Sequence, residues 1–251
     1  MPTDETTTNS AIVTGASRGF GRAVTIALVR SGLRVVGVAR DRSKLDGLQA
    51  QLGDGFIPVP ADAADPVIAG QLIDAYRPQT LVLNAGATPL SRPLHQHTWQ
   101  SFSRNWEVDV QQVFHWTREA LLAPLRPGST VIAFSSGAAV NGSPISGGYA
   151  GAKATIRFIS SYAAEESARA ELGIRFVAVL PGLTPATDLG AVSVSAYARR
   201  QGTDVQTFLS SRGPSAGPEQ VGRAVLELAT TAALDRPAYL LGADGSLATL
   251  P

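Results

Sequence analysis

The chain has 251 residues, of which 44% are hydrophobic, and its 21 basic and 20 acidic residues give a formal net charge of +1. A balanced charge argues against binding to nucleic acid or to a membrane surface, because those partners attract a clustered excess of cations. The absence of cysteine excludes disulfides, thiolate nucleophiles, iron–sulfur clusters and cysteine zinc sites. Two of the 21 basic residues, Lys44 and Lys153, are lysines and the other 19 are arginines. Lys44 looks incidental on a polar helix, whereas Lys153 belongs to a motif.

Short apolar segments of strand length alternate with longer amphipathic segments along the chain. We expect strands at 11–13, 34–38, 56–59, 81–83, 131–134, 176–180 and 239–241. We expect helices at 22–30, 42–52, 66–76, 97–122, 149–172 and 218–231. The strands are runs of Val, Ile and Leu without polar alternation, which indicates burial on both faces of a parallel sheet. The pattern predicts the α/β class: a single doubly wound Rossmann-type domain with a parallel sheet of about seven strands and helices on both faces.

Two segments depart from this alternation. Residues 1–9 are polar and rich in threonine, lack the features of a signal peptide, and are expected to form a disordered tail before a single domain at 10–251. Residues 184–217 contain several prolines and glycines around a helical patch at 196–209, and an insertion of this length predicts a substrate lid. No apolar run approaches the roughly 18 residues that span a bilayer, so we expect a cytoplasmic protein without membrane contact.

A glycine-rich segment follows the first expected strand and opens the first helix. The spacing of Gly15, Gly19 and Gly21 lets the backbone approach a pyrophosphate, whose charge would be met by N–H groups at the start of the helix. Arg40 ends the second strand, where NAD-specific sites usually carry an acidic residue; with Arg18 it could hold a 2′-phosphate, which favours NADP. The cofactor-binding candidates in this half of the chain are Thr14, Gly15, Ser17, Arg18, Gly19, Phe20, Gly21, Arg40, Asp62, Ala63, Asn84, Ala85 and Gly86.

Tyr149 and Lys153 are four residues apart at the start of an expected helix, so they project from one face. An ammonium group beside a phenol favours the phenolate, and such a pair can exchange a proton with an alcohol or a carbonyl. With five tyrosines and two lysines, this spacing arises by chance only about 0.04 times in such a chain. Ser136, at the end of the strand at 131–134, could donate a hydrogen bond to a substrate carbonyl. Ser135 is the alternative, and strand alternation implies that only one of the two faces the site.

These motifs resemble, in their order and spacing, those of the short-chain dehydrogenase/reductase superfamily, and the resemblance covers nearly the whole chain. It implies that Tyr149 is the general acid/base, that Lys153 favours the phenolate and binds the nicotinamide ribose, and that Ser136 orients the carbonyl. Hydride would pass between the nicotinamide and a substrate carbon. The resemblance also implies a homo-oligomer, a tetramer or a dimer. It adds as cofactor contacts Tyr149, Lys153, Pro181, Gly182 and either Thr184 or Thr187, the threonine holding the carboxamide.

Two positions depart from the family pattern. Asp109 stands where the family usually has an asparagine whose backbone carbonyl holds a water that relays protons to the lysine. We still count Asp109 as catalytic, because the family uses the backbone carbonyl at this position and the replacement of asparagine by aspartate leaves that carbonyl in place. An ionised Asp109 carboxylate would, however, neutralise part of the effect of Lys153. The threonine that the family places four residues after the glycine falls at Ala186, so Thr184 and Thr187 both remain candidates.

The predicted function is NADPH-dependent reduction of a small or medium apolar ketone or aldehyde. The alternatives are oxidation of an alcohol with NADP and a non-enzymatic NADP-binding regulator on the same fold. No metal site is expected, because the three histidines lack acidic residues or cysteines at ligand spacing. The predicted substrate contacts are Ser136, Ala138, Val140, Leu183 and Tyr197.

Overall fold

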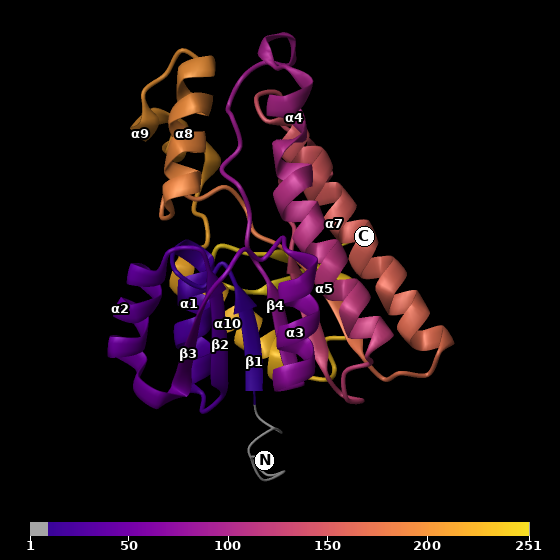
Figure 1. Ribbon diagram of the computed structural model, residues 1–251. Helices are drawn as coiled ribbons and strands as arrows, with labels where there is room; N and C mark the ends of the chain where they lie inside the picture. Colours follow the sequence, from indigo (N-terminus) through magenta and orange to yellow (C-terminus); the bar gives the residue numbers. More distant parts are fainter. Residues whose placement is uncertain (1–9, 251) are drawn as a thin grey trace.

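The computed structural model describes residues 10–250, which fold around one eight-stranded sheet with helices on both faces (Figure 1). The predicted tail at 1–9 lies outside the described residues. The strand order is β3-β2-β1-β4-β5-β6-β7-β8. The strands are β1 (Ser10–Thr14), β2 (Arg34–Ala39), β3 (Phe56–Pro60), β4 (Thr80–Leu83), β5 (Thr130–Phe134), β6 (Arg175–Leu180), β7 (Ala238–Leu241) and β8 (Leu247–Thr249).

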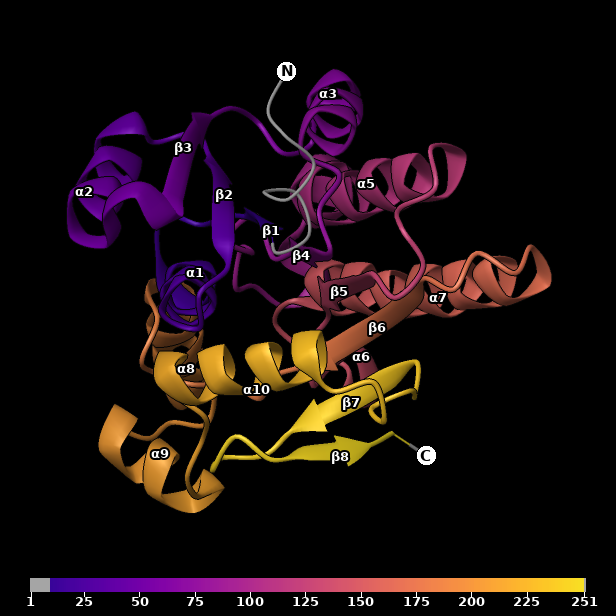
Figure 2. The ribbon, with the colours of Figure 1, turned by 90° about the horizontal axis from the view of Figure 1, so that it is seen from below.

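Seven parallel strands confirm the predicted fold class, and an eighth strand extends the sheet. Strand β8 pairs with β7 in the antiparallel direction at one edge of the sheet (Figure 2). Its three residues are too few to show a hydrophobic period, which is why the sequence does not reveal it. The order reverses between β1 and β4, whose carboxyl ends therefore flank the crevice in which sheets of this type bind ligands.

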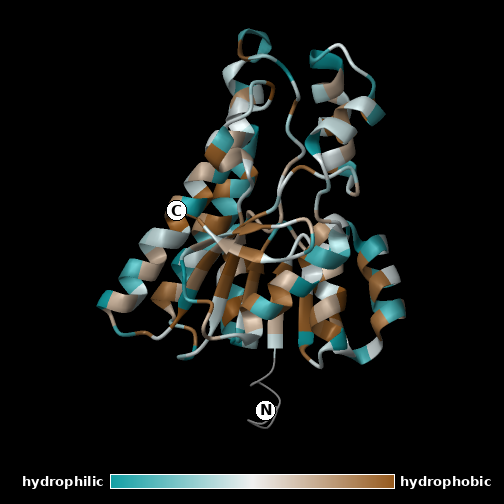
Figure 3. Ribbon diagram, turned by 180° about the vertical axis from the view of Figure 1, so that it is seen from behind, coloured by the Kyte–Doolittle hydropathy of each residue, from teal (hydrophilic) through white to brown (hydrophobic). Residues whose placement is uncertain are grey.

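Side chains that alternate along each strand fill two separate hydrophobic cores. In β1, Ala11 and Val13 point into one core and Ile12 points into the other, all without exposed surface. The first core is covered by α1 (Gly19–Arg30), α2 (Arg42–Leu52) and α10 (Pro218–Thr230), and the second by α3 (Pro66–Tyr76), α5 (Gln111–Leu122) and α7 (Gly147–Arg169) (Figure 2). Figure 3 shows the strongly hydrophobic strands between helices of mixed character. Burial on both faces explains the unbroken apolar runs in the sequence.

The helix predicted at 97–122 is broken into three parts. Helix α4 (Trp99–Asn105) is followed by a π-helical turn, η4 (Trp106–Val110), and then by α5. A reciprocal pair of hydrogen bonds between Thr98 and Ser101 caps the start of α4. A π-helical turn inside an α-helix often marks a functional site, and this one contains Asp109.

The segment after β6 forms two helices above the carboxyl ends of the strands. Helices α8 (Asp188–Arg200) and α9 (Val205–Arg212) pack on each other around Val194, Ala198 and Phe208, and they lie on the other side of the molecule from α4 (Figure 1). The remaining short elements are η2 (Gly53–Gly55), η3 (Leu94–Gln96) and α6 (Ala138–Asn141). Within residues 10–250, no helix has both the length and the apolar character needed to cross a bilayer.

Candidate active site

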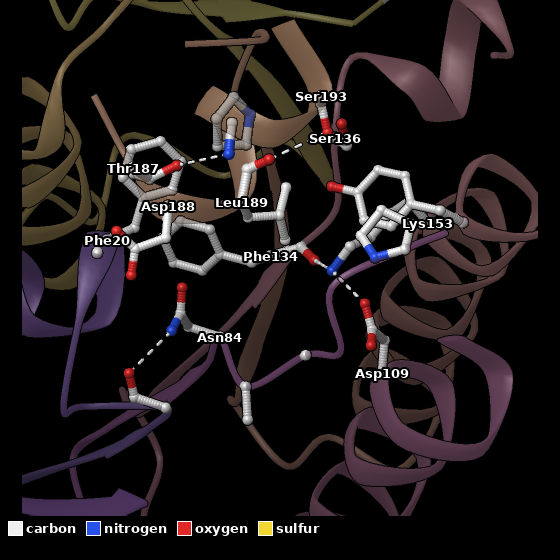
Figure 4. Close-up of a pocket in the computed structure, with 18 of the residues that line it drawn as sticks. Phe20, Asn84, Asp109, Phe134, Ser136, Lys153, Thr187, Asp188, Leu189 and Ser193 are labelled. Atoms are coloured by element: carbon white, nitrogen blue, oxygen red, sulfur yellow. Dashed lines mark hydrogen bonds and ion pairs between the residues drawn. The ribbon is translucent and has the colours of Figure 1, made fainter. Parts of the chain in front are cut away.

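A cleft of about 910 Å³ lies at the carboxyl ends of the parallel strands. It extends from the end of β2, past the glycine-rich segment, to the start of α7 and to α8. Figure 4 shows some of the residues that line it. Its volume is near the upper limit of typical small-molecule sites, about 1,000 Å³. The predicted residues that line it are Gly15, Ser17, Arg18, Gly19, Phe20, Arg40, Asp62, Ala63, Asn84, Ala85, Gly86, Asp109, Ser136, Ala138, Tyr149, Lys153, Pro181, Gly182, Leu183, Thr184, Thr187 and Tyr197.

Three predicted site residues do not line the cleft. Thr14 is fully buried, and its hydroxyl accepts hydrogen bonds from the backbone N–H groups of Asn84 (2.9 Å) and Ala85 (3.1 Å). It therefore ties β1 to the segment after β4, and its contribution to the site is indirect. Val140 is half exposed on the short helix α6 and is not among the residues that border the cleft. The third, Gly21, belongs to the packing of the glycine-rich segment.

The glycines of that segment serve two different purposes. A Cβ on Gly21 would lie 2.1 Å from the carbonyl oxygen of Gly15, and a Cβ on Gly15 would lie 2.7 Å from Asn84 Nδ2. These two glycines thus allow the turn to pack against the chain after β4. Gly19 has a left-handed φ of 52°, and a Cβ there would meet only the side chain of Thr187, at 3.7 Å, on the opposite side of the cleft.

Helix α1 begins at this turn without a capping side chain and without an acidic residue in its first turn. Its first N–H groups and the positive end of its dipole therefore face the cleft uncompensated. Such a helix start suits the pyrophosphate of a dinucleotide, so the residues present fit this group.

Cations cluster at the end of the cleft next to β2. Arg40 is exposed directly after β2, and Lys44, which looks incidental in the sequence, also lines the cleft. Sequence reasoning missed Asp41, which stands between them. Its carboxylate accepts the Lys44 N–H (3.1 Å), which caps α2 and holds the pKa of Asp41 below its usual value. The same carboxylate forms an ion pair with Lys44 Nζ at 3.4 Å.

Tyr149 and Lys153 lie one turn apart on α7, as the spacing predicts, and both line the cleft. Lys153 is 6% exposed; its ammonium donates a hydrogen bond to the Phe134 carbonyl (2.9 Å) and lies 3.2 Å from Asp109 Oδ2 (Figure 4). Burial opposes the charge on Lys153, but the Asp109 carboxylate and the Tyr149 phenol outweigh it and raise the Lys153 pKa. The ammonium is therefore held in its charged form beside the phenol, 5.5 Å from the ring centre.

Asp109 has no exposed surface and is held through both carboxylate oxygens. Oδ1 accepts hydrogen bonds from the Ala87 N–H (2.8 Å) and from Asn105 Nδ2 (3.3 Å). Among the described residues, the ion pair with Lys153 is the one polar contact of Oδ2. The sequence identified Asp109 as a departure but missed Asn105, whose position four residues earlier in a helix is the signal that could have found it.

The structure distinguishes the two serines at the end of β5. Ser135 is buried, and its hydroxyl donates to the backbone carbonyl of Lys153 (2.7 Å), which fixes α7 against the sheet. Both serines border the cleft, but the Ser136 hydroxyl only accepts, from the N–H of Ala138 (3.2 Å), and its own hydrogen is left to donate. Ser136 is therefore the serine in position to meet a ligand.

The two candidate threonines also differ. Thr184 is 4% exposed, and its hydroxyl accepts the Ala186 N–H (3.3 Å). Thr187 caps the start of α8, where its hydroxyl accepts the Gly190 N–H (3.1 Å), and it faces Gly19 across the cleft (Figure 4). Its hydrogen remains available to a ligand in the cleft.

The end of the cleft beside Tyr149 is less apolar than the sequence suggests. Ala138 and Leu183 line it as predicted, but so do the polar side chains of Asn141, Ser146 and Ser193. These three residues lie in segments whose contact with the cleft depends on how α6, α7 and α8 pack around it, so the sequence carries no local signal for them.

Comparison with known proteins gives matches along most of the chain. The short chain dehydrogenase family model matches residues 9–197. An uncharacterized short-chain type dehydrogenase/reductase of Sinorhizobium fredii is 34% identical over 158 residues, covering 60% of this chain and 60% of the relative. L-xylulose reductase of Homo sapiens is 33% identical over 123 residues, covering 48% of this chain and 50% of that protein. The matched regions thus span about half to three fifths of these relatives.

Two solved structures are similar in fold. A 3-ketoacyl-(acyl-carrier-protein) reductase from Brucella melitensis complexed with NADH superposes with a TM-score of 0.76 at 22% identity, over 96% of this chain and 98% of the other. A metagenomic short-chain oxidoreductase in complex with NADP gives a TM-score of 0.71 at 24% identity, over 93% of this chain and 96% of the other. Because the family model matches about three quarters of this chain, the chain belongs to the short-chain dehydrogenase/reductase superfamily.

Proposed function

We propose that the protein is an NADPH-dependent carbonyl reductase in which Tyr149 is the general acid/base. The observation that carries this proposal is that the Tyr149–Lys153 pair and the uncapped start of α1 border the same cleft. The reductive direction is supported by the matched L-xylulose reductase, which is a reductase by name.

The chain's own residues account for the proton and for the orientation of the substrate. A nicotinamide dinucleotide bound in the cleft supplies the hydride for the carbonyl carbon. Tyr149 donates its phenol proton to the carbonyl oxygen, which becomes the alcohol oxygen. Ser136 donates a hydrogen bond to the same oxygen, and the charged Lys153 stabilises the phenolate that remains. Thr187, rather than the buried Thr184, would hold the carboxamide.

The preference for NADP rests on the cations beside β2. Arg40 and Lys44 line the cleft there, and Arg18, within the glycine-rich segment, also lines it. The Asp41 carboxylate caps α2 and pairs with Lys44, so it offsets the charge of Lys44 rather than that of Arg40. We expect Arg40→Leu to weaken NADPH binding about tenfold or more, the value of a charged hydrogen bond, and NADH binding by less than twofold. Equal losses for both nucleotides would remove the argument for NADP.

The test of the function is NADPH oxidation over a panel of ketones and aldehydes. Tyr149→Phe should abolish turnover while NADPH binding, followed by nicotinamide fluorescence, stays unchanged. Tyr76→Phe on α3, outside the lining of the cleft, is the matched control. Turnover by the Tyr149→Phe variant would refute the mechanism. NADP-dependent oxidation of alcohols without reduction of carbonyls would favour the oxidative alternative, and NADPH binding without any turnover would favour a regulator.

We further propose that the chain forms a homo-oligomer through the outer face of η4, α5 and α7. This face exposes four aromatic side chains, Trp106, Phe114, Phe158 and Tyr162, of which the last two stack on each other. Exposed apolar patches of this kind favour association. Phe158→Glu should then lower the mass measured by light scattering after gel filtration, and an unchanged mass would exclude this face.

A further inference from the structure

Hydroxyl groups from two different elements meet beside the catalytic end of the cleft. Ser143 and Ser146 lie just before α7, and Tyr197 lies on α8. Ser143 Oγ is 2.6 Å from Ser146 Oγ and 2.5 Å from the phenol oxygen of Tyr197. Ser146 and Tyr197 both line the cleft. The three hydroxyls thus form a chain that connects the α8–α9 segment to the start of the helix carrying Tyr149.

The hydrogen-bonding capacity of this chain determines what it offers to a ligand. A serine hydroxyl donates one hydrogen bond and accepts two. Ser143 already accepts the Ser146 N–H (3.1 Å), so it accepts from one of its two hydroxyl neighbours and donates to the other. The neighbour that donates to Ser143 has free lone pairs, and the one that accepts from it has a free O–H. Together Ser146 and Tyr197 therefore present both a donor and an acceptor to the cleft, whichever way the chain is oriented.

This combination suits a substrate group that both donates and accepts hydrogen bonds, and a hydroxyl is the simplest such group beside a carbonyl. A hydroxyl both donates and accepts, whereas an ether only accepts and an alkyl group does neither. Ser193, one turn before Tyr197 on α8, adds a further acceptor, because its hydroxyl donates to the Leu189 carbonyl (3.1 Å) and keeps its lone pairs free (Figure 4).

The hydroxyls of Ser146 and Tyr197 are close to the position proposed for the reacting carbonyl. Ser146 occupies the N-cap position of α7, three residues before Tyr149, without a side-chain capping hydrogen bond, and both residues line the cleft. A substrate whose carbonyl meets Tyr149 and Ser136 therefore places its neighbouring carbon within reach of Ser146 and Tyr197.

Tyr197 is held in place before any ligand arrives. Its ring stacks on Phe208 of α9, with centroids 6.0 Å apart and an interplanar angle of 5°, beside Val194 and Ala198. A group that is already immobilised loses little conformational entropy when a ligand binds, so its hydrogen bond contributes more to selection.

We propose that the substrate is a hydroxylated ketone, with hydroxyl groups on the carbons next to the carbonyl, rather than the apolar ketone that the sequence suggests. This inference rests on the proposed reductase function and names its substrate class. The hydroxyls of Ser146 and Tyr197 recognise the substrate hydroxyl, and Ser143 orients them both.

The test compares three ketones that differ only in this group: dihydroxyacetone, dimethoxyacetone and diethyl ketone. The methoxy compound controls for the electron withdrawal by oxygen, which activates the carbonyl, and the ethyl compound controls for size. We expect kcat/KM, measured with NADPH and with NADH, to be at least about tenfold higher for dihydroxyacetone than for the other two. Tenfold corresponds to one neutral hydrogen bond.

Tyr197→Phe removes the phenol oxygen but keeps the ring stacked on Phe208. It should lower kcat/KM for dihydroxyacetone about tenfold and leave that for diethyl ketone within about twofold. Ser146→Ala should reproduce this selective loss, and it keeps the test open if the first variant misfolds. Tyr76→Phe should change none of the three values.

Each other result has a distinct meaning. Equal kcat/KM values for the three ketones in the wild type, or equal losses for all three in Tyr197→Phe, overturn the inference and leave the reductase function intact. Reduction of apolar ketones alone, with hydroxylated ketones of three to six carbons inactive, does the same. No reduction of either class removes the inference together with the proposed function.

Discussion

Replacement of Asp109 by asparagine changes one charge in a buried ion pair and little else in shape. The Asn side-chain oxygen can still accept from the Ala87 N–H, but an NH₂ group then faces the Lys153 ammonium, 3.2 Å away, in place of an anionic oxygen. Two donors confront each other, and Lys153 retains only the Phe134 carbonyl as a partner. The variant thus isolates what the carboxylate contributes to stability and to turnover.

The size of the loss follows from the geometry. At 3.2 Å and an effective dielectric constant of about 20, the attraction between the two charges is about 5 kcal/mol. Removal of one partner from a buried pair typically costs about 3–5 kcal/mol. The Phe134 hydrogen bond remains, and the pair borders an open cleft, so we expect a loss of about 3 kcal/mol in the free energy of unfolding at pH 7. For a chain of this length, that loss lowers Tm by about 6–12 °C.

The dependence on pH has a definite sign. The Lys153 pKa is raised in the folded protein, so the folded state binds this proton more tightly than the unfolded state does. The resulting stabilisation is fully present below the unfolded lysine pKa of about 10.4 and is lost as the pH rises through the folded value. The difference in stability between wild type and Asp109→Asn should therefore be constant from pH 7 to 9 and should shrink above about pH 10.

Thermal unfolding followed by circular dichroism measures both effects. Asp188→Asn is the matched control, because it removes the carboxylate of an exposed pair with Arg18 and should leave Tm unchanged. A Tm within about 2 °C of wild type for Asp109→Asn would show that the pair contributes no net stability. Turnover at neutral pH should change less than tenfold, because the implied proton relay uses the backbone carbonyl. An increase above tenfold, about 1.4 kcal/mol, would mark the carboxylate as a handicap.

Further substitutions probe Lys153, the glycine-rich segment and the packing of α10. Lys153→Arg should lower turnover about 100-fold or more, since a larger cation in this buried site displaces the phenol; wild-type turnover would show that any cation suffices there. Gly21→Ala places a Cβ 2.1 Å from the carbonyl oxygen of Gly15 and should abolish nucleotide binding in titrations, whereas Gly47→Ala, with open space on α2, should raise stability by about 0.5–1 kcal/mol. Arg175 donates to three carbonyl oxygens at and beyond the end of α10, at 2.6 to 2.9 Å, and so caps this helix. Arg175→Met should therefore lower the free energy of unfolding, measured in urea, by about 2–3 kcal/mol. An unchanged free energy of unfolding would exclude a stabilising role for these hydrogen bonds.

The sequence by itself determined the layered architecture and the extent of most elements. The helices at 42–52 and 66–76 have the predicted bounds, and the seven parallel strands match the predicted apolar runs within one or two residues. These features depend on local signals: hydrophobic period, strand length and the distribution of proline and glycine. The pairing of Tyr149 with Lys153 on one face of a helix is local in the same sense, since it follows from a spacing of four.

Only the tertiary structure decided which side chains meet. Asp109 and Lys153 form an ion pair although they are 44 positions apart in the sequence. Asp109 lies in a π-helical turn, which the hydrophobic pattern of the sequence does not predict. The choice of Ser136 over Ser135 depends on α7 crossing behind β5, where Ser135 reaches the Lys153 carbonyl. The hydroxyl chain through Tyr197 depends on the packing of α8 against α9. Local sequence sets backbone preference within a few residues, whereas these contacts are set by how whole elements pack, and the chemistry of the cleft depends on them.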